Sequence, residues 1–97
     1  MTETERVDAF IRAKQDEVLG KAIATVETAA PDELAAQVHR LVGTLGTFGL
    51  TDAATSLQPL NQALKAGADP NSPEAVALRE AAANDLRQLA AARQEDS

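Results

Sequence analysis

Apolar residues recur along this chain at steps of three, four or seven, the spacing that places them on one face of an α-helix. The pattern predicts four helical segments, with no internal repeat between them. Their apolar positions are, in chain order, Val7, Phe10, Ile11, Val18, Ala22, Val26 and Ala29; Leu34, Val38, Leu41, Leu45 and Phe48; Leu50, Ala53, Leu57, Leu60 and Leu64; and Ala75, Leu78, Ala82, Leu86 and Leu89. Because short connections join these amphipathic segments, we expect an all-α fold, an antiparallel four-helix bundle.

Capping residues and prolines mark where these helices begin. Thr2 and Glu5 have the spacing of a capping box, which starts the first segment, expected over about residues 3–30. Pro31 suits the first turn of the second helix. Ser72 followed by Pro73 is a strong start signal for the fourth.

The sequence also indicates where the second helix ends, where the third begins and where the chain frays. Gly46 and Gly49 are both candidates for the C-terminal cap of the second helix. Thr51–Asp52 is the expected cap and first turn of the third, and the polar tail at 93–97 is expected to fray.

Within the helices, Gly20 bends the first segment, marks a close helix contact or splits it in two. Pro59 faces away from the apolar stripe, which predicts a kinked third helix rather than a broken one.

The composition agrees with a small helical protein. The 97 residues suffice for one core, so we expect 1–97 to form a single helical domain. Hydrophobic residues make up 44% of the chain and about half of them are alanine, the best helix former. The absence of cysteine excludes disulfides, cysteine-bound zinc and thiol catalysis. One histidine, His39, excludes metal sites built from several histidines.

Charge narrows the classes of partner. Fifteen acidic and nine basic residues leave a net charge of −6, which disfavours binding to nucleic acid or to anionic lipid. The N-terminus is acidic and polar, unlike a secretory signal, and no apolar run approaches the length of a membrane span. We therefore expect a cytoplasmic protein that binds neither nucleic acid nor membrane.

His39 is the residue with candidate chemistry. On a helical wheel it lies about 120–140° from the centre of the apolar stripe of its helix, outside the core. The residues around it on the same face are small or apolar, namely Ala35, Ala36, Val42, Gly43 and Gly46. A glycine inside a helix costs about 0.5–1 kcal/mol relative to alanine, so Gly43 and Gly46 need a compensating reason. Either another protein's active site approaches the imidazole there, or a neighbouring helix packs there.

The residues that follow His39 form a motif. The segment His39-Arg40-Leu41-Val42-Gly43-Thr44, followed by Phe48-Gly49, resembles the signature of histidine-containing phosphotransfer (HPt) domains. That signature is approximately His-x-Leu-Lys-Gly-Ser, then a hydrophobic residue and a glycine nine and ten positions after the histidine. Leu41, Gly43, Phe48 and Gly49 match it, and Thr44 replaces serine. The resemblance spans roughly residues 7–90. Val42 departs from it, because the family usually carries lysine there.

The resemblance implies a phosphorelay carrier with no self-contained catalytic activity. His39 would accept a phosphoryl group from a sensor histidine kinase or a receiver-domain aspartate and relay it to another aspartate. Ala35, Ala36, Val42, Gly43 and Gly46 would then form the docking patch. The glycines at 43, 46 and 49 do not have the spacing of a nucleotide-binding loop, and the sequence offers no credible cluster of metal ligands. Neither a cofactor nor a metal is therefore expected in the chain itself.

Val42 motivates an alternative. In the family, the lysine at this position helps to hold the phosphoryl group by charge. Its absence fits a non-phosphorylated helical adaptor that binds a receiver or kinase without transfer. A substrate domain of a larger kinase is a third interpretation.

Overall fold

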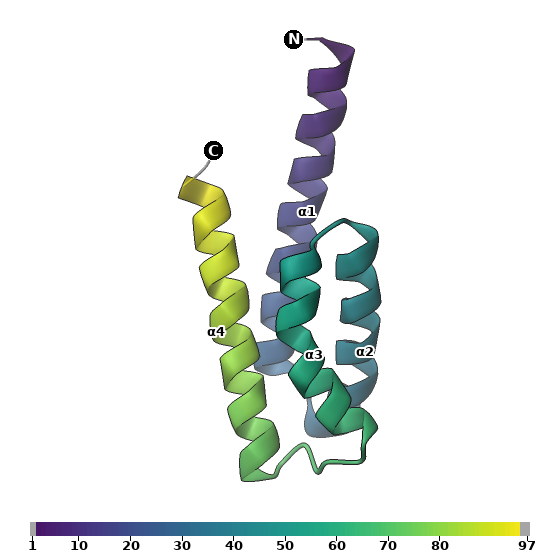
Figure 1. The fold of residues 1–97 in the computed structure, drawn as a ribbon, viewed down its shortest axis with the longest axis vertical. Helices are drawn as coiled ribbons and strands as arrows, with labels where there is room; N and C mark the ends of the chain where they lie inside the picture. Colours follow the sequence, from purple (N-terminus) through teal and green to yellow (C-terminus); the bar gives the residue numbers. More distant parts are fainter. Residues whose placement is uncertain (1, 96–97) are drawn as a thin grey trace.

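The computed structural model describes residues 2–95, which form an antiparallel bundle of four helices (Figure 1). The helices are α1 (Glu3–Thr28), α2 (Pro31–Thr47), α3 (Thr51–Lys65) and α4 (Pro73–Glu95). Helix α1 packs against α2 and α4, and α3 packs against the same two helices. The predicted all-α four-helix bundle is therefore confirmed.

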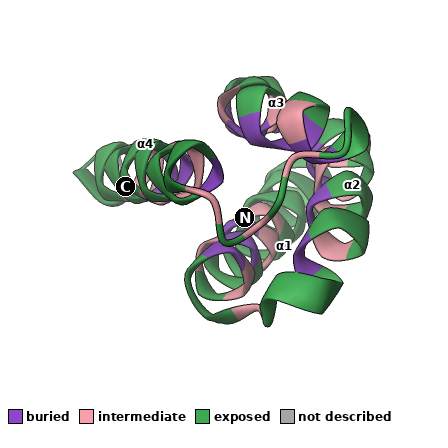
Figure 2. Cartoon of the chain, turned by 90° about the horizontal axis from the view of Figure 1, so that it is seen from below, coloured by how far each residue is buried: buried purple, intermediate pink, exposed green. Residues whose placement is uncertain are grey.

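The buried residues lie on the inner faces of the helices (Figure 2), and the apolar ones among them are leucine, valine and alanine. One buried cluster joins all four helices and contains Leu19, Ala22, Val26, Leu45, Leu50, Ala53, Leu57, Ala82 and Leu86. A second buried cluster contains Leu34, Val38, Leu60 and Leu64. Burying each of the larger side chains contributes about 1.5–3 kcal/mol, so these stripes hold the bundle together.

Local side-chain chemistry starts three of the helices where the sequence predicts. Thr2 and Glu5 form the capping box: the Thr2 hydroxyl accepts from the Glu5 amide at 3.2 Å, and the Glu5 carboxylate accepts from the Thr2 amide at 3.4 Å. Pro31 is the first residue of α2. The Ser72 hydroxyl accepts from the Ala75 amide at 3.2 Å at the start of α4.

Gly49 ends α2. Its φ of +75° lies in the left-handed region that glycine adopts without strain. The Gly49 amide donates to the Gly46 carbonyl at 3.1 Å, and the Leu50 amide donates to the Leu45 carbonyl at 2.8 Å. This pair of bonds is a Schellman motif, which satisfies carbonyls that the helix end leaves free.

The prediction that Thr51 caps α3 is wrong. Leu50 occupies the N-cap position, and no side chain caps this helix. The reason is the short connection between the helices. Leu50 is buried, and its amide closes the end of α2 while its carbonyl accepts from the Ala54 amide at 3.0 Å in α3. Thr51 is therefore already inside the helix.

Neither Gly20 nor Pro59 interrupts its helix. Helix α1 runs through Gly20, and a Cβ atom added there would meet no atom within 4 Å, so the split and the close helix contact are both wrong. Helix α3 continues through Pro59, which confirms that it is not broken there, and the kink stays a prediction.

Helix α4 is longer than predicted. It continues to Glu95, because the Arg93 guanidinium is held by α1, donating to Asp16 Oδ1 at 2.7 Å and Gln15 Oε1 at 3.1 Å. The fraying expected from Arg93 onward is thus wrong up to Glu95, and positions 96 and 97 lie outside the described residues.

The first turns of α1 extend beyond the bundle (Figure 1). Helix α1 has 26 residues, whereas α2 has 17 and α3 has 15. At 1.5 Å per residue the excess over α2 is about 14 Å. Val7, Phe10 and Ile11 are 51%, 63% and 45% exposed, so the apolar face predicted for this helix is not buried along its whole length.

Candidate functional site

His39 is the central residue of α2, eight positions from each end, and its side chain is exposed. The preceding residue, Val38, is fully buried and anchors this part of the helix in the core. A helix dipole acts mainly within the first and last turns, and each end of α2 is about 12 Å from His39 along the axis. The helix termini therefore supply little charge to the imidazole.

The residues predicted to surround His39 do so. At 100° per residue, Ala35, Ala36, Val42, Gly43 and Gly46 all lie within about 60° of it around α2. All are exposed except Val42, which is half-buried and packs against the larger core cluster. We call these five residues together with His39 the His39 face.

The glycines of the His39 face have no packing partner. A Cβ atom added at Gly43 or at Gly46 would meet no atom within 4 Å. The alternative that a neighbouring helix packs there is therefore wrong. The helix-propensity cost of these glycines is not offset by any contact in the part of the chain described, and the access of another protein to His39 stays a prediction.

The imidazole of His39 makes no hydrogen bond to any other residue in 2–95. The nearby hydroxyl groups are used within α2 itself: Thr44 donates to the Arg40 carbonyl at 3.0 Å and Thr47 donates to the Gly43 carbonyl at 3.0 Å. Both ring nitrogens are thus open to a group brought by another molecule.

The basic residue next to His39 points to a different side of the helix. Arg40 lines a shallow groove between α1 and α2, together with Thr25, Gln37, Leu41 and Thr44, whereas His39 does not. Its position is about 100° around α2 from His39. Because every other residue of the His39 face is uncharged, that face holds no cation to stabilise a phosphoryl group.

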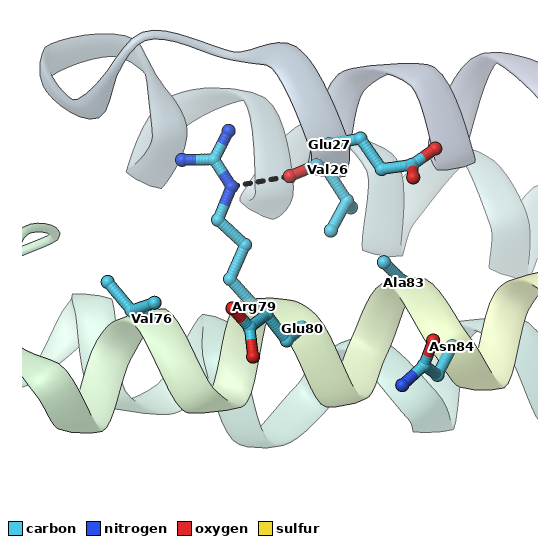
Figure 3. Close-up of a pocket in the computed structure, with 7 residues that line it drawn as sticks. All are labelled: Val26, Glu27, Val76, Arg79, Glu80, Ala83 and Asn84. Atoms are coloured by element: carbon cyan, nitrogen blue, oxygen red, sulfur yellow. Dashed lines mark hydrogen bonds between the residues drawn. The ribbon is translucent and has the colours of Figure 1, made fainter.

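A larger groove lies elsewhere, between α1 and α4 (Figure 3). Its volume is about 600 Å³, and it is lined by Val26, Glu27, Val76, Arg79, Glu80, Ala83 and Asn84. The Arg79 guanidinium crosses this groove and donates to the carbonyls of Val26 and Ala29, the latter at 2.7 Å. It satisfies the C-terminal end of α1, whose last turn has no basic residue of its own. The contact is structural, and the pattern of the sequence does not indicate it.

Residues 2–95 contain no group of three or more histidine, aspartate or glutamate side chains placed to hold a metal ion. None of the helices within this range is long and apolar enough to cross a membrane.

Residues 11–95 match the family model described as "Hpt domain". Neither a curated protein nor a solved structure matches the chain.

Proposed function

The chain belongs to the Hpt domain family, and on that premise we propose that it is a cytoplasmic phosphocarrier whose acceptor is His39. Hpt domains act in histidine phosphotransfer in phosphorelays, and they interact with receiver domains and kinases. The observation that carries the proposal is the environment of the single histidine. It is exposed at the centre of a helix, its imidazole makes no hydrogen bond to the described residues, and it shares its face with two glycines in open space.

The proposed transfer follows from the chemistry of a neutral imidazole. The lone pair on Nε2 of His39 attacks the phosphorus of an aspartyl phosphate on a receiver domain. The P–N bond forms as the P–O bond to the aspartate breaks, and the carboxylate leaves with the electron pair. In the onward step the carboxylate of another receiver attacks phosphorus, and the imidazole leaves with the electron pair of the P–N bond.

The partner supplies the charge for this reaction. Phosphoryl transfer depends on positioning and on neutralisation of the phosphoryl oxygens by cations. The His39 face is uncharged, so we assign those cations to the receiver or kinase that binds it. The small residues beside His39 are consistent with cations supplied by the partner, because they let the imidazole enter another protein's active site.

The direct test is His39→Gln, which removes the nucleophile and keeps a polar side chain of similar reach. Purified protein is mixed with a receiver domain that carries labelled aspartyl phosphate, or with a kinase and labelled ATP. We expect acid-labile, alkali-stable label on the wild-type chain and none on the variant. Arg40→Gln, on the other flank of α2, is the matched control and should still accept label. Equal labelling of His39→Gln would refute the proposal.

A second candidate function is favoured by Val42, which stands where the family usually has lysine. A helical adaptor would bind a receiver or kinase through the His39 face but transfer nothing. It predicts that partner capture is unaffected by His39→Gln and that the wild-type chain acquires no label. If the wild-type chain acquires label, it is a phosphocarrier and not an adaptor.

A further inference from the structure

The part of α1 that extends beyond the bundle carries an exposed apolar face of its own. Val7, Phe10 and Ile11 are about half exposed or more. At 100° per residue their mean direction is roughly 100° around α1 from that of the buried Leu19, Ala22 and Val26. Val7 and Phe10 therefore lie to one side of the core stripe, whereas Ile11 continues that stripe beyond the bundle. An exposed apolar cluster of this kind marks an interaction site.

Charged residues border this face at its two ends. Along one side of α1 the order is Glu3, Val7, Phe10, Lys14, within a stripe about 60° wide. Glu3 has no ion-pair partner within 2–95. The Lys14 ammonium lies 5.8 Å from the centroid of the Phe10 ring and 3.4 Å from an exposed carboxylate oxygen of Glu17. We call Glu3, Val7, Phe10, Ile11 and Lys14 the α1 tip face.

This order of charges complements the same order on a second copy that runs in the opposite direction. In an antiparallel pair, Glu3 opposes Lys14 of a second copy while Val7 opposes Phe10 of that copy. Both pairs are centred on the same point of the helix, between positions 8 and 9, so one register satisfies them together. A parallel pair would instead place Glu3 against Glu3 and Lys14 against Lys14.

We propose that the α1 tip face binds the same face of a second copy of this chain, in antiparallel orientation about a two-fold axis. Such a contact is isologous, as in most homodimers. Stable interfaces bury about 1,200–2,000 Å² in total, and a contact of about three helical turns falls below that range, which makes this a weak, concentration-dependent dimer. The His39 face belongs to α2 and is not used by it, so both copies remain able to bind a phosphorelay partner.

Sedimentation velocity over a range of protein concentrations tests the dimer, with charge exchange to test its register. We expect the wild-type chain to shift from monomer to dimer as concentration rises. Glu3→Lys alone and Lys14→Glu alone should each stay monomeric, because like charges then oppose each other. An equimolar mixture of these two variants should dimerise, since each contact then joins a lysine to a glutamate. Phe10→Ala should abolish dimerisation.

Lys21→Glu is the matched control, because it reverses an exposed charge on α1 outside the tip face and should dimerise like the wild-type chain. Circular dichroism confirms that each variant keeps its helical content. A wild-type chain that stays monomeric at every concentration refutes the proposal. So does a dimer that Phe10→Ala leaves intact, or a mixture that associates no better than its components. Phosphotransfer to Phe10→Ala should be unchanged, which separates this test from that of the proposed function.

Discussion

Gly43 and Gly46 show at the residue scale how the absence of a side chain can point to function. The sequence left two explanations for them, and the empty space around both positions excludes helix packing. Gly20 is also an exposed helix glycine with open space around it, but it lies on α1. Two of these glycines share a face with His39 and one does not, which permits a matched comparison.

We expect Gly43→Leu to stabilise the protein and impair its function. Leucine has a higher helix propensity than glycine, so the free energy of unfolding should rise by about 0.5–1 kcal/mol. The new side chain would stand beside His39 and obstruct an approaching partner, lowering the phosphotransfer rate at least about tenfold, or about 1.4 kcal/mol in activation free energy. Urea unfolding and labelled-receiver assays measure the two effects.

Gly20→Leu is the control for that experiment. It should give the same gain in stability and leave the transfer rate unchanged, because α1 does not contribute to the His39 face. Equal rates for Gly43→Leu and the wild-type chain would contradict the role assigned to the open space at Gly43.

Val42→Lys should raise the rate of transfer. An ammonium about 4 Å from the phosphoryl group contributes about 1 kcal/mol in a water-like environment, which corresponds to roughly a fivefold increase in rate. The half-buried position allows the aliphatic stem to pack against the core while the charge reaches solvent. Val42→Met, of similar length without charge, is the control, and an equal rise in both variants would contradict the electrostatic explanation.

The helices, considered as elements, differ in how their ends are held. The start of α1, the start of α4 and the end of α2 are closed by residues close by in sequence, through the Thr2 and Ser72 caps and the glycine turn at Gly49. The end of α1 is closed by Arg79, which lies 50 positions away from Ala29. Ends of the first kind follow from local patterns, whereas this one depends on where α4 packs.

Arg79→Met should therefore destabilise the bundle through the end of α1. The substitution keeps most of the aliphatic stem and removes charged donors from two carbonyls, a loss of about 1–3 kcal/mol. For a chain of this size each kcal/mol lowers Tm by about 4–8 °C. Thermal unfolding followed by circular dichroism measures it. Arg87→Met, which breaks an exposed ion pair with Glu27, should cost at most about 1 kcal/mol; an equal loss in both would argue against the capping role.

At the scale of the whole molecule, burial decides how much an apolar residue contributes to the free energy of unfolding. Leu57 is fully buried in the cluster that joins all four helices, whereas Phe10 is 63% exposed beyond the ends of α2 and α3. Both belong to apolar stripes in the sequence. Their difference arises because one end of α1 extends past α2 and α3, and because Phe10 points away from the side of α1 that is buried.

Leu57→Ala should lower the free energy of unfolding by about 2–5 kcal/mol, because it leaves a cavity in the core. Phe10→Ala removes a larger side chain but should change stability by no more than about 0.5 kcal/mol, measured with dilute, monomeric protein. Chemical unfolding of the two variants side by side makes the comparison. A loss at Phe10 as large as that at Leu57 would show that the tip of α1 packs within the monomer.

The sequence alone determined the four helices, most of their boundaries, the inner faces of α2, α3 and α4, and the placement of His39 outside the core. These features follow from the helical period and from caps a few residues long, which act within one element. Only the tertiary structure decided that Leu50 rather than Thr51 precedes α3, that Arg79 closes α1, that Gly43 and Gly46 face open space, and that the apolar tip of α1 is exposed. Each of these depends on which element lies opposite, and that is set by the lengths and offsets of all four helices together.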